Sequence, residues 1–458
     1  IVDKEKDLFQ TPPIPDPAAG KRSLASTDDG SVVDLMVVYT PGARLAVGGK
    51  EPMEAVIYKG VDETNLAFQN SLINSRVRLV HQQEVNYTEA LSAKEYDDLV
   101  KSGAQNIPSA TGFVYPDDED FRYLYAGRNG PLGDVYNWRE TYGADLVVFL
   151  NKRSGGKGGG LGDTFCLVGQ GRVGGSDYTF SHEIGHLFGC SHAVGDSYWK
   201  TPPGTEKSPG KYHYGWHFFV AGQRKCTIMA YSQADYRYAT AGKHVPHYSN
   251  PDVLYSGVPT GSRVDGEDMA NNARRINETA ASVAGHRQSL PAASVPTNVS
   301  ASDGEFSGRV HIEWDSVSGA THYRVYRSTD LYGDVPVAIT RWQTSTSADD
   351  FHGDPYVTYY YWVKAAKSQT GSLASNFVFS QADTGWRKLR RPIMVKASDG
   401  DYTNKITVNW TIADDATHYR VYRSETEDGK KTAVTGWQTS KSCIDPNNMT
   451  EAREIYYY

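Results

Sequence analysis

Cysteine is scarce in this chain, with four residues among 458, at positions 166, 190, 226 and 443. No two of them form a C-x-x-C pair, so the sequence predicts no zinc site built on cysteine. It also has no run of 18 or more apolar residues, and we expect no membrane span. Basic runs are absent beyond Arg387–Arg391, and 54 acidic against 47 basic residues give a net charge of −7. We therefore expect no nucleic-acid partner.

Aromatic residues, by contrast, are plentiful, with 31 tyrosines in the chain. Tyrosine, tryptophan, threonine and valine favour strands, so we expect much of the chain to be β-rich. A chain of 458 residues is too long for one hydrophobic core. Its length therefore favours roughly two to four domains.

The stretch from His182 to His192 has the spacing of a metal site. It reads H-E-x-x-H-x-x-G-x-x-H. His182 and His186 are four residues apart, so on a helix both imidazoles project from one face and can hold one Zn²⁺. Gly189 tolerates the positive φ of a helix end, which lets the chain turn and bring His192 back as a third ligand.

Three histidines leave the fourth tetrahedral position open, which is typical of a catalytic zinc site rather than a structural one. Glu183 lies beside the histidine face, where its carboxylate can reach a water on the metal rather than the metal itself. H-E-x-x-H alone is expected by chance on the order of two times in a hundred such chains, so a merely coincidental pattern is disfavoured. The other candidate ligands belong to no such pattern and are expected to be structural: His213, His217, His244 and His247.

These residues resemble the motif of the metzincin clan of zinc endopeptidases. The clan carries a methionine in a tight turn beneath the metal, and the segment Cys226–Ser232, here called the Met-turn, matches it with Met229. The wider run over roughly residues 31–288 is similar to secreted bacterial reprolysin-like peptidases. Ala193 departs from reprolysins proper, which carry an acidic residue there, and Tyr231 is placed as in astacins and serralysins.

The resemblance implies an α/β fold, a twisted mixed sheet with helices packed on it, and Zn²⁺ as the cofactor, with calcium as a further candidate. Met229 is implied to be a hydrophobic floor. Tyr231 is implied either to bind the transition-state oxyanion or to be a fifth zinc ligand, and a packed turn tyrosine is the open alternative. The family's cleft is lined by an edge strand that pairs with extended substrate. Thr164–Gly169 is predicted to be that strand, approached by a run with six glycines among residues 155–162.

Cys190 and Cys226 are predicted to form a disulfide. Cys190 lies inside the zinc motif and Cys226 opens the Met-turn, and the resemblance implies that both segments converge on the metal. Such a bond would indicate an oxidising compartment, and with it a secreted protein. The alternative is a pair of buried thiols.

Hydrophobic periodicity divides the first part of the chain into strands and helices. Residues 1–30 are rich in proline and small polar residues, and we expect a pro-segment remnant or linker there. Residues 31–289 are predicted to form the zinc metallopeptidase domain. Its strands are expected at 32–39, 76–85 and 145–150, and its helices at 51–73, 93–102, 177–189 and 266–289.

A linker at 290–296 is followed by an internal repeat with an offset of 96 residues. The segment Ala320–Ser328 (ATHYRVYRS) recurs as Ala416–Ser424, and Trp314 recurs as Trp410. Alternating strands with an early tryptophan resemble fibronectin type III sandwiches. We therefore predict two all-β fibronectin type III-like domains, at 297–386 and 387–458, the second incomplete for want of its final strand.

The sequence thus predicts a secreted zinc endopeptidase that cleaves protein or peptide substrates with a metal-activated water and Glu183 as general base. One alternative is a non-catalytic adhesin with a structural zinc site, whose repeats bind carbohydrate or matrix. Another is a zinc hydrolase acting on a glycan or a cell-wall peptide. Glu183 favours catalysis over the adhesin, because a structural zinc site needs no general base.

Overall fold

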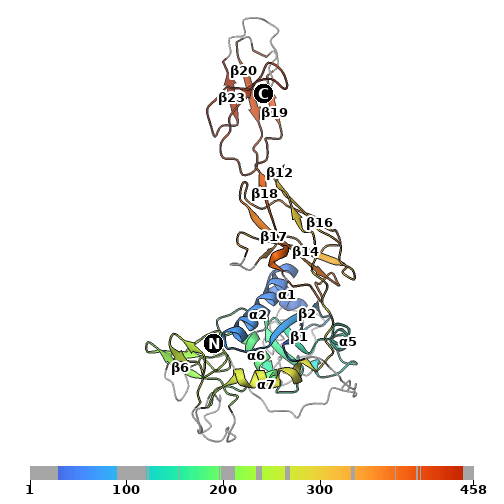
Figure 1. Ribbon diagram of the computed structural model, residues 1–458, viewed down its shortest axis with the longest axis vertical. Coiled ribbons are helices and arrows are strands. Elements are labelled where there is room, and N and C mark those ends of the chain that lie inside the picture. Colours follow the sequence, from blue (N-terminus) through green and yellow to red (C-terminus); the bar gives the residue numbers. More distant parts are fainter. Residues whose placement is uncertain are drawn as a thin grey trace, which may run out of the picture. The chain divides into compact units, whose positions relative to one another are not determined.

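The computed structural model describes residues 29–89, 120, 123–153, 155–194, 196, 212–233, 240–263, 269–331, 336–376, 378–398, 401–402 and 404–446 (Figure 1). The chain divides into two compact units. The first comprises Ile1–Ala292 with the short segment Thr370–Leu373, and the second comprises Ala293–Gln369 with Ala374–Tyr458. Among the described residues, no helix is long and apolar enough to cross a membrane.

The first unit is built on a five-stranded sheet with the order β2-β1-β3-β5-β4. The strands are β1 (Val32–Tyr39), β2 (Arg76–Glu84), β3 (Leu146–Asn151), β4 (Gly156–Gly158) and β5 (Phe165–Gly169). Strands β1, β2, β3 and β5 run parallel, and β4 is antiparallel to β5. The central strands β1 and β3 are apolar except for Asp34 and Asn151, because they are covered on both faces.

Alternate residues of the central strands enter two separate cores. Leu35 and Val148 belong to the larger core, which takes Ile57 from α2 (Lys50–Asn70) and Ile184 from α6 (Thr179–Leu187). The opposite face carries Met36, Val147 and residues of α5 (Gly133–Tyr142). Helix α7 (Asn272–Ala284) packs in the larger core with α2 and α6, and α1 (Pro41–Ala46) begins just after β1. This sandwich of helices, sheet and helix confirms the predicted mixed α/β architecture.

The predicted edge strand is wrong in its position. Thr164–Gly169 corresponds to β5, which has β3 on one side and β4 on the other. The outer strand is β4, which lies inside the glycine run. Glycine weakens a strand, so sequence pattern favoured the more apolar segment that follows.

The helices near the site are shorter than the sequence predicts. Helix α6 starts at Thr179 because Tyr178, just before it, has a left-handed φ of 55°. Helix α7 starts at Asn272, since the side chain of Asn271 caps it by accepting from the Arg274 N–H at 2.9 Å. The predicted helix at 93–102 and nearly all of residues 1–30 lie outside the described residues.

Short strands surround the Met-turn in the first unit. Strands β6 (His217–Val220), β7 (Gln223–Cys226) and β8 (Lys243–His244) form one small sheet, and β9 (Leu254–Tyr255) pairs with β10 (Val258–Pro259). Strand β7 leads directly into the Met-turn, so this sheet holds the turn at its base.

The second unit is all β apart from one 3-10 turn (η2) among its described residues. Its first half has the sheets β11-β13-β16 and β12-β18-β17-β14-β15, and its second half has β19-β20-β23 and β21-β22. Their bounds are β11 Ser300–Ala301, β12 Asp303–Ser307, β13 Val310–Glu313, β14 His322–Ser328, β15 Val337–Ala338, β16 Ser347–Asp350, β17 Tyr359–Ala366, β18 Asp383–Lys388, β19 Val395–Ala397, β20 Ile406–Trp410, β21 Tyr422–Arg423, β22 Thr432–Ala433 and β23 Ser442–Asp445.

The sequence repeat is a repeat of structure. Trp314 and Tyr323 have ring centroids 5.7 Å apart at 56°, and Trp410 and Tyr419 have the same separation at 57°. In each half the tyrosine hydroxyl accepts a backbone N–H from the preceding turn, and an arginine pairs with a buried aspartate, Arg327 with Asp350 and Arg423 with Asp445. Each half therefore has its own core around the tryptophan.

Candidate metal centre

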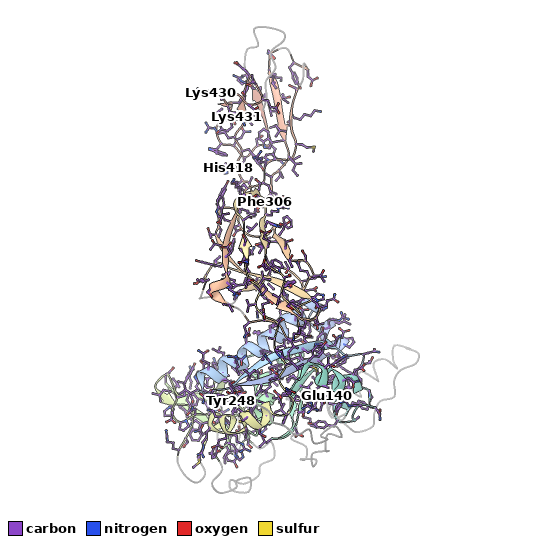
Figure 2. The ribbon with its side chains drawn as sticks, turned by 45° about the vertical axis from the view of Figure 1, so that its right-hand side comes forward. Glu140, Tyr248, Phe306, His418, Lys430 and Lys431 are labelled. Atoms are coloured by element: carbon purple, nitrogen blue, oxygen red, sulfur yellow. The ribbon has the colours of Figure 1, made fainter. Side chains whose placement is uncertain are left out.

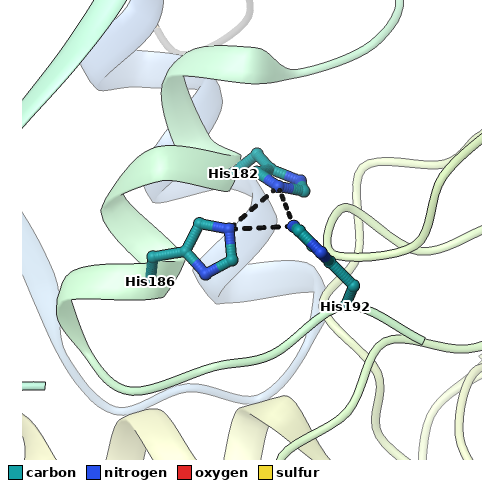
Figure 3. A group of neighbouring side chains, drawn as sticks. All are labelled: His182, His186 and His192. Carbon is teal, nitrogen blue, oxygen red and sulfur yellow. Dashed lines mark hydrogen bonds between the residues drawn. The ribbon is translucent and has the colours of Figure 1, made fainter. Parts of the chain in front are cut away.

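Three imidazoles converge in the first unit, as Figure 3 shows. The Nε2 atoms of His182 and His192 are 3.0 Å apart, those of His186 and His192 3.0 Å, and those of His182 and His186 3.2 Å. Helix α6 carries the first two, and the chain after the helix returns the third. Among the described residues, this histidine triad is the only group of three or more potential metal-ligating side chains.

Backbone geometry brings His192 back to the helix. Gly189 has φ +83°, a left-handed conformation that other residues adopt at a cost. The Gly189 N–H donates to His186 O at 2.8 Å, and the Cys190 N–H donates to Gly185 O at 3.0 Å, so the end of α6 is closed by backbone hydrogen bonds. A Cβ at Gly189 would also lie 2.9 Å from Nε of Arg275, which leaves no room for a side chain.

The protein orients two of these rings through their other nitrogens. His182 Nδ1 donates to Ile228 O at 2.8 Å, and His186 Nδ1 donates to Cys190 O at 2.9 Å. A proton on Nδ1 leaves the Nε2 lone pair free for a metal. Burial, with the neighbouring His186 and His192, holds the pKa of His182 well below its ordinary value, so this imidazole is neutral.

The spacing of the triad fits Zn²⁺. Zinc–nitrogen bonds of roughly 2.0–2.1 Å at tetrahedral angles place ligand nitrogens about 3.3 Å apart. The observed 3.0–3.2 Å is close to that value. Calcium prefers several oxygen ligands, and the described residues contain no such cluster, so calcium stays a prediction of the resemblance alone.

The Met-turn lies directly beneath the metal helix. Met229 is fully buried, and a Cβ placed at Gly185 would lie 2.5 Å from its sulfur. Because Gly185, between His182 and His186, has no side chain, the sulfur of Met229 can lie against the helix at that position. Tyr248, labelled in Figure 2, is also buried there and donates from its hydroxyl to Ser181 O at 2.6 Å. Met229 thus touches the helix that carries the ligands.

Glu183 lies on the side of α6 that faces strand β4. Its side chain is buried, with the residue 3% exposed. A Cβ at Gly156 would lie 2.2 Å from one carboxylate oxygen of Glu183. Glu183 directly follows His182 in the sequence, and the outer strand β4 covers its carboxylate.

Tyr231 lies against the third histidine. Its ring centroid is 4.3 Å from that of His192 and 6.2 Å from that of His182. Its backbone N–H donates to Oδ2 of Asp196 at 2.7 Å, and Oδ1 of Asp196 accepts from His217 Nε2 at 2.7 Å. Asp196 therefore joins the segment after His192 to the Met-turn.

Asp196 is a functional candidate that the sequence did not reveal. The available signal was an acidic residue four positions after His192, in a stretch where Ala193 replaces the acid of reprolysins proper. Two of the other histidines considered earlier have structural partners, since His217 pairs with Asp196 and His244 lies 2.7 Å from Ala230 O.

The predicted disulfide between Cys190 and Cys226 is wrong. None of the four cysteines forms a disulfide. Cys190 belongs to the large core and points to Asn272 O, whereas Cys226 packs in a separate small cluster with Ala193 and Ala230 and points to Tyr231 O. The two segments do approach one metal centre, but their sulfurs enter different cores. Cys190 and Cys226 are therefore the buried thiols of the alternative interpretation.

A site of this kind places the first unit among the zinc metallopeptidases. Residues 29–241 match the model of a family described as Metallo-peptidase family M12, of the Reprolysin_5 type. This part of the chain is thus similar to the metzincin-like zinc metallopeptidases.

Two curated relatives carry the name peptidyl-Asp metalloendopeptidase. The protein from Xanthomonas campestris is 28% identical over 285 residues, which cover 59% of this chain and 56% of that protein. The protein from Stenotrophomonas maltophilia is 28% identical over 300 residues, which cover 62% of this chain and 60% of that protein. The chain therefore spans less than two thirds of the length of these relatives.

One solved structure matches a short part of this chain. An Fn3-like protein from Clostridium thermocellum is 28% identical over 22% of this chain and 99% of its own, with a TM-score of 0.18. This score is too low to establish a fold.

Proposed function

We propose that the chain is a secreted zinc-dependent endopeptidase. The observation that carries this proposal is the convergence of three Nε2 atoms, 3.0–3.2 Å apart, beside the buried carboxylate of Glu183. Bacterial relatives named as metalloendopeptidases support the endopeptidase part of this proposal. The proposal of secretion rests only on the resemblance of the sequence to secreted bacterial reprolysin-like peptidases.

His182, His186 and His192 would hold the zinc ion. When bound, zinc supplies the acidification of a water molecule and the polarisation of the scissile carbonyl. Glu183 accepts the proton of that water at its carboxylate and passes it to the leaving amine. Met229 supports α6 from below. Gly189 keeps His192 in place.

Tyr231 is proposed to stabilise the oxyanion from the His192 side. Its ring lies 4.3 Å from the His192 ring. On this proposal Tyr231→Phe lowers kcat and leaves zinc content unchanged. A packed turn tyrosine would instead show the same kcat after loss of its hydroxyl, measured on the same peptide.

Extended peptide is the substrate that fits the sheet. Among the described residues β4 is the outermost strand of the sheet, and an extended peptide is proposed to add along it. The relatives' names specify aspartyl peptide bonds for those proteins, and we propose the same preference here. Cleavage-site profiling on a peptide library tests it, and cuts without enrichment of aspartate would contradict it.

The second unit is proposed to contain two fibronectin type III-like domains, over residues 297–386 and 387–458, joined to the domain at 31–289 through 290–296. The matching Trp–Tyr pairs of the two halves support this division. Residues 447–458, on which the prediction of an incomplete second domain depends, lie outside the described part of the chain. We propose that these domains act as spacers or as binding modules for carbohydrate or matrix.

The decisive experiment compares wild type with Glu183→Ala on casein, with and without a zinc chelator. We expect chelation to abolish cleavage, zinc to restore it, and Glu183→Ala to lower kcat by a factor on the order of 10²–10⁴. Zinc content should stay equal in both proteins. Glu278→Ala, which removes a carboxylate with 42% exposure, serves as the control and should keep full activity. Cleavage that resists the chelator, or near-normal turnover by Glu183→Ala, would refute the proposal.

A further inference from the structure

Strand β4 lies along one ridge of helix α6. A Cβ at Gly156 would lie 2.2 Å from Oε1 of Glu183 and 2.7 Å from Cγ2 of Thr179. A Cβ at Gly158 would lie 2.9 Å from Oε2 of Glu183 and 3.0 Å from Cβ of His186. The helix residues touched are four and three apart, which is one face of a helix. Positions 156 and 158 share one face of the strand, so both glycines face this ridge.

Space, rather than backbone conformation, requires these two glycines. Neither Gly156 nor Gly158 is among the residues with positive φ, whereas Gly155 and Gly162 have φ +129° and +95°. Gly160 also lacks a positive φ, and a Cβ there would meet nothing within 4 Å. Glycine is thus required by backbone conformation at 155 and 162, by the carboxylate of Glu183 at 156 and 158, and by neither at 160.

The atom that must yield to a side chain at 156 is the carboxylate itself. Oε1 is the end of a flexible side chain, so it can move away where backbone could not. The Cβ of an alanine would push it from the strand, whereas none of the three atoms nearest to that Cβ belongs to a histidine ligand, so we expect the ligands to keep their places. A substitution here therefore separates the position of Glu183 from the binding of metal.

We propose that Gly156 and Gly158 are positioning residues for Glu183, and that the close approach of bare β4 backbone fixes the carboxylate at the place from which it acts as general base. The inference rests on the proposed function of Glu183. It adds that the outer strand, besides offering an edge to the peptide, sets the geometry of the proton acceptor.

The first test compares Gly156→Ala and Gly158→Ala with Gly160→Ala in the full chain. Misplacement of a reacting group by about 1 Å can cost on the order of 10²-fold in rate. We expect Gly156→Ala to lower kcat by that order, with little change in KM and with zinc content equal to wild type. Gly160→Ala, the same change in the same run, should keep wild-type kcat. Equal kcat for Gly156→Ala and Gly160→Ala, or loss of zinc from Gly156→Ala, overturns the proposal.

The second test needs no activity. The melting temperature of Gly156→Ala is measured in the wild-type and the Glu183→Ala backgrounds, since removal of the carboxylate removes the group that the new Cβ meets. We expect a smaller loss in the Glu183→Ala background, and an equal loss in both backgrounds overturns the proposal. A wild type without chelator-sensitive cleavage would sink the proposed function but leave this comparison intact.

Discussion

Asp196 illustrates, at the scale of single residues, how one buried carboxylate can join two segments of a site. Its two oxygens accept from the Tyr231 N–H and from His217, and the residue is 4% exposed. Asp196→Ala leaves both donors buried without that partner, which costs about 1–3 kcal/mol for each. We expect the free energy of unfolding to fall by about 3 kcal/mol in denaturant titration, with kcat reduced through displacement of Tyr231.

Asp252→Ala is the matched control for this prediction. Asp252 is 56% exposed and pairs with Arg263, which is 70% exposed. Exposed pairs of this kind contribute roughly 0–1 kcal/mol. Similar losses of stability in the two variants would show that Asp196 is no more than a surface acid.

The residues of the histidine triad could be predicted from the sequence because all three lie within 11 positions, where helix geometry and one glycine determine their placement. Asp196 could not, since its partner Tyr231 is 35 residues away and only the fold brings them together. The error over Cys190 and Cys226 has the same origin. Two segments that meet at a metal fix neither the direction of their side chains nor the core that each sulfur enters.

At the scale of single elements, the stability of the segment after α7 depends on pH through His286. Burial lowers the pKa of His286 to about 4, with Arg139 adding to the effect. In the unfolded chain the pKa is about 6.5. Below pH 6.5 the unfolded state therefore binds a proton at His286, whereas the folded state binds it only near pH 4. The stability that is present above pH 6.5 is lost as the pH falls from 6.5 to about 4.

His286→Gln should remove this component. We expect the stability difference between pH 7 and pH 4 to shrink by about 3 kcal/mol relative to wild type, measured on the transition of the first unit. Parallel stability curves for variant and wild type would contradict the assignment. The loss of the contact between His286 and Asp145 O lowers stability equally at all pH values, so only the slope decides.

Elements with long apolar runs could be predicted well. Strand β1 and strand β3 come from the runs VVDLMVVY and LVVFLN, which only a doubly covered sheet accommodates. Strand β4 could not be predicted, because GKG has neither apolar alternation nor strand propensity. Strand β4 lies where it does because it packs on one face of α6, and the periodicity of the sequence does not indicate that contact.

The whole molecule has two compact units, and only the first carries the histidine triad. A ligand that binds the folded state alone stabilises it by about 2.7 kcal/mol at a concentration 100 times its Kd. We therefore expect calorimetry of the full chain to show a chelator-sensitive transition from the first unit and a chelator-insensitive one from the second. Equal shifts of every transition on zinc removal would contradict this division.

The repeat at the scale of the molecule was readable from the sequence because it recurs residue by residue, from Ala320–Ser328 to Ala416–Ser424. The spacing of the two copies in the sequence does not show which contacts hold each copy together. The tyrosine of each copy closes its own turn and stacks on its own tryptophan, so each copy holds itself together.

Strand β4 has a consequence for how the protein behaves in concentrated solution. An unpaired strand edge is a template for the edge of any other molecule, and long flat apolar edges promote aggregation. Strand β4, the outermost of its sheet among the described residues, has three residues, two of them glycines that lose much entropy on ordering, and the third is Lys157. A strand of this kind is too short and too hydrophilic to join identical copies into a continuous sheet. Its composition therefore disfavours self-association of the protein.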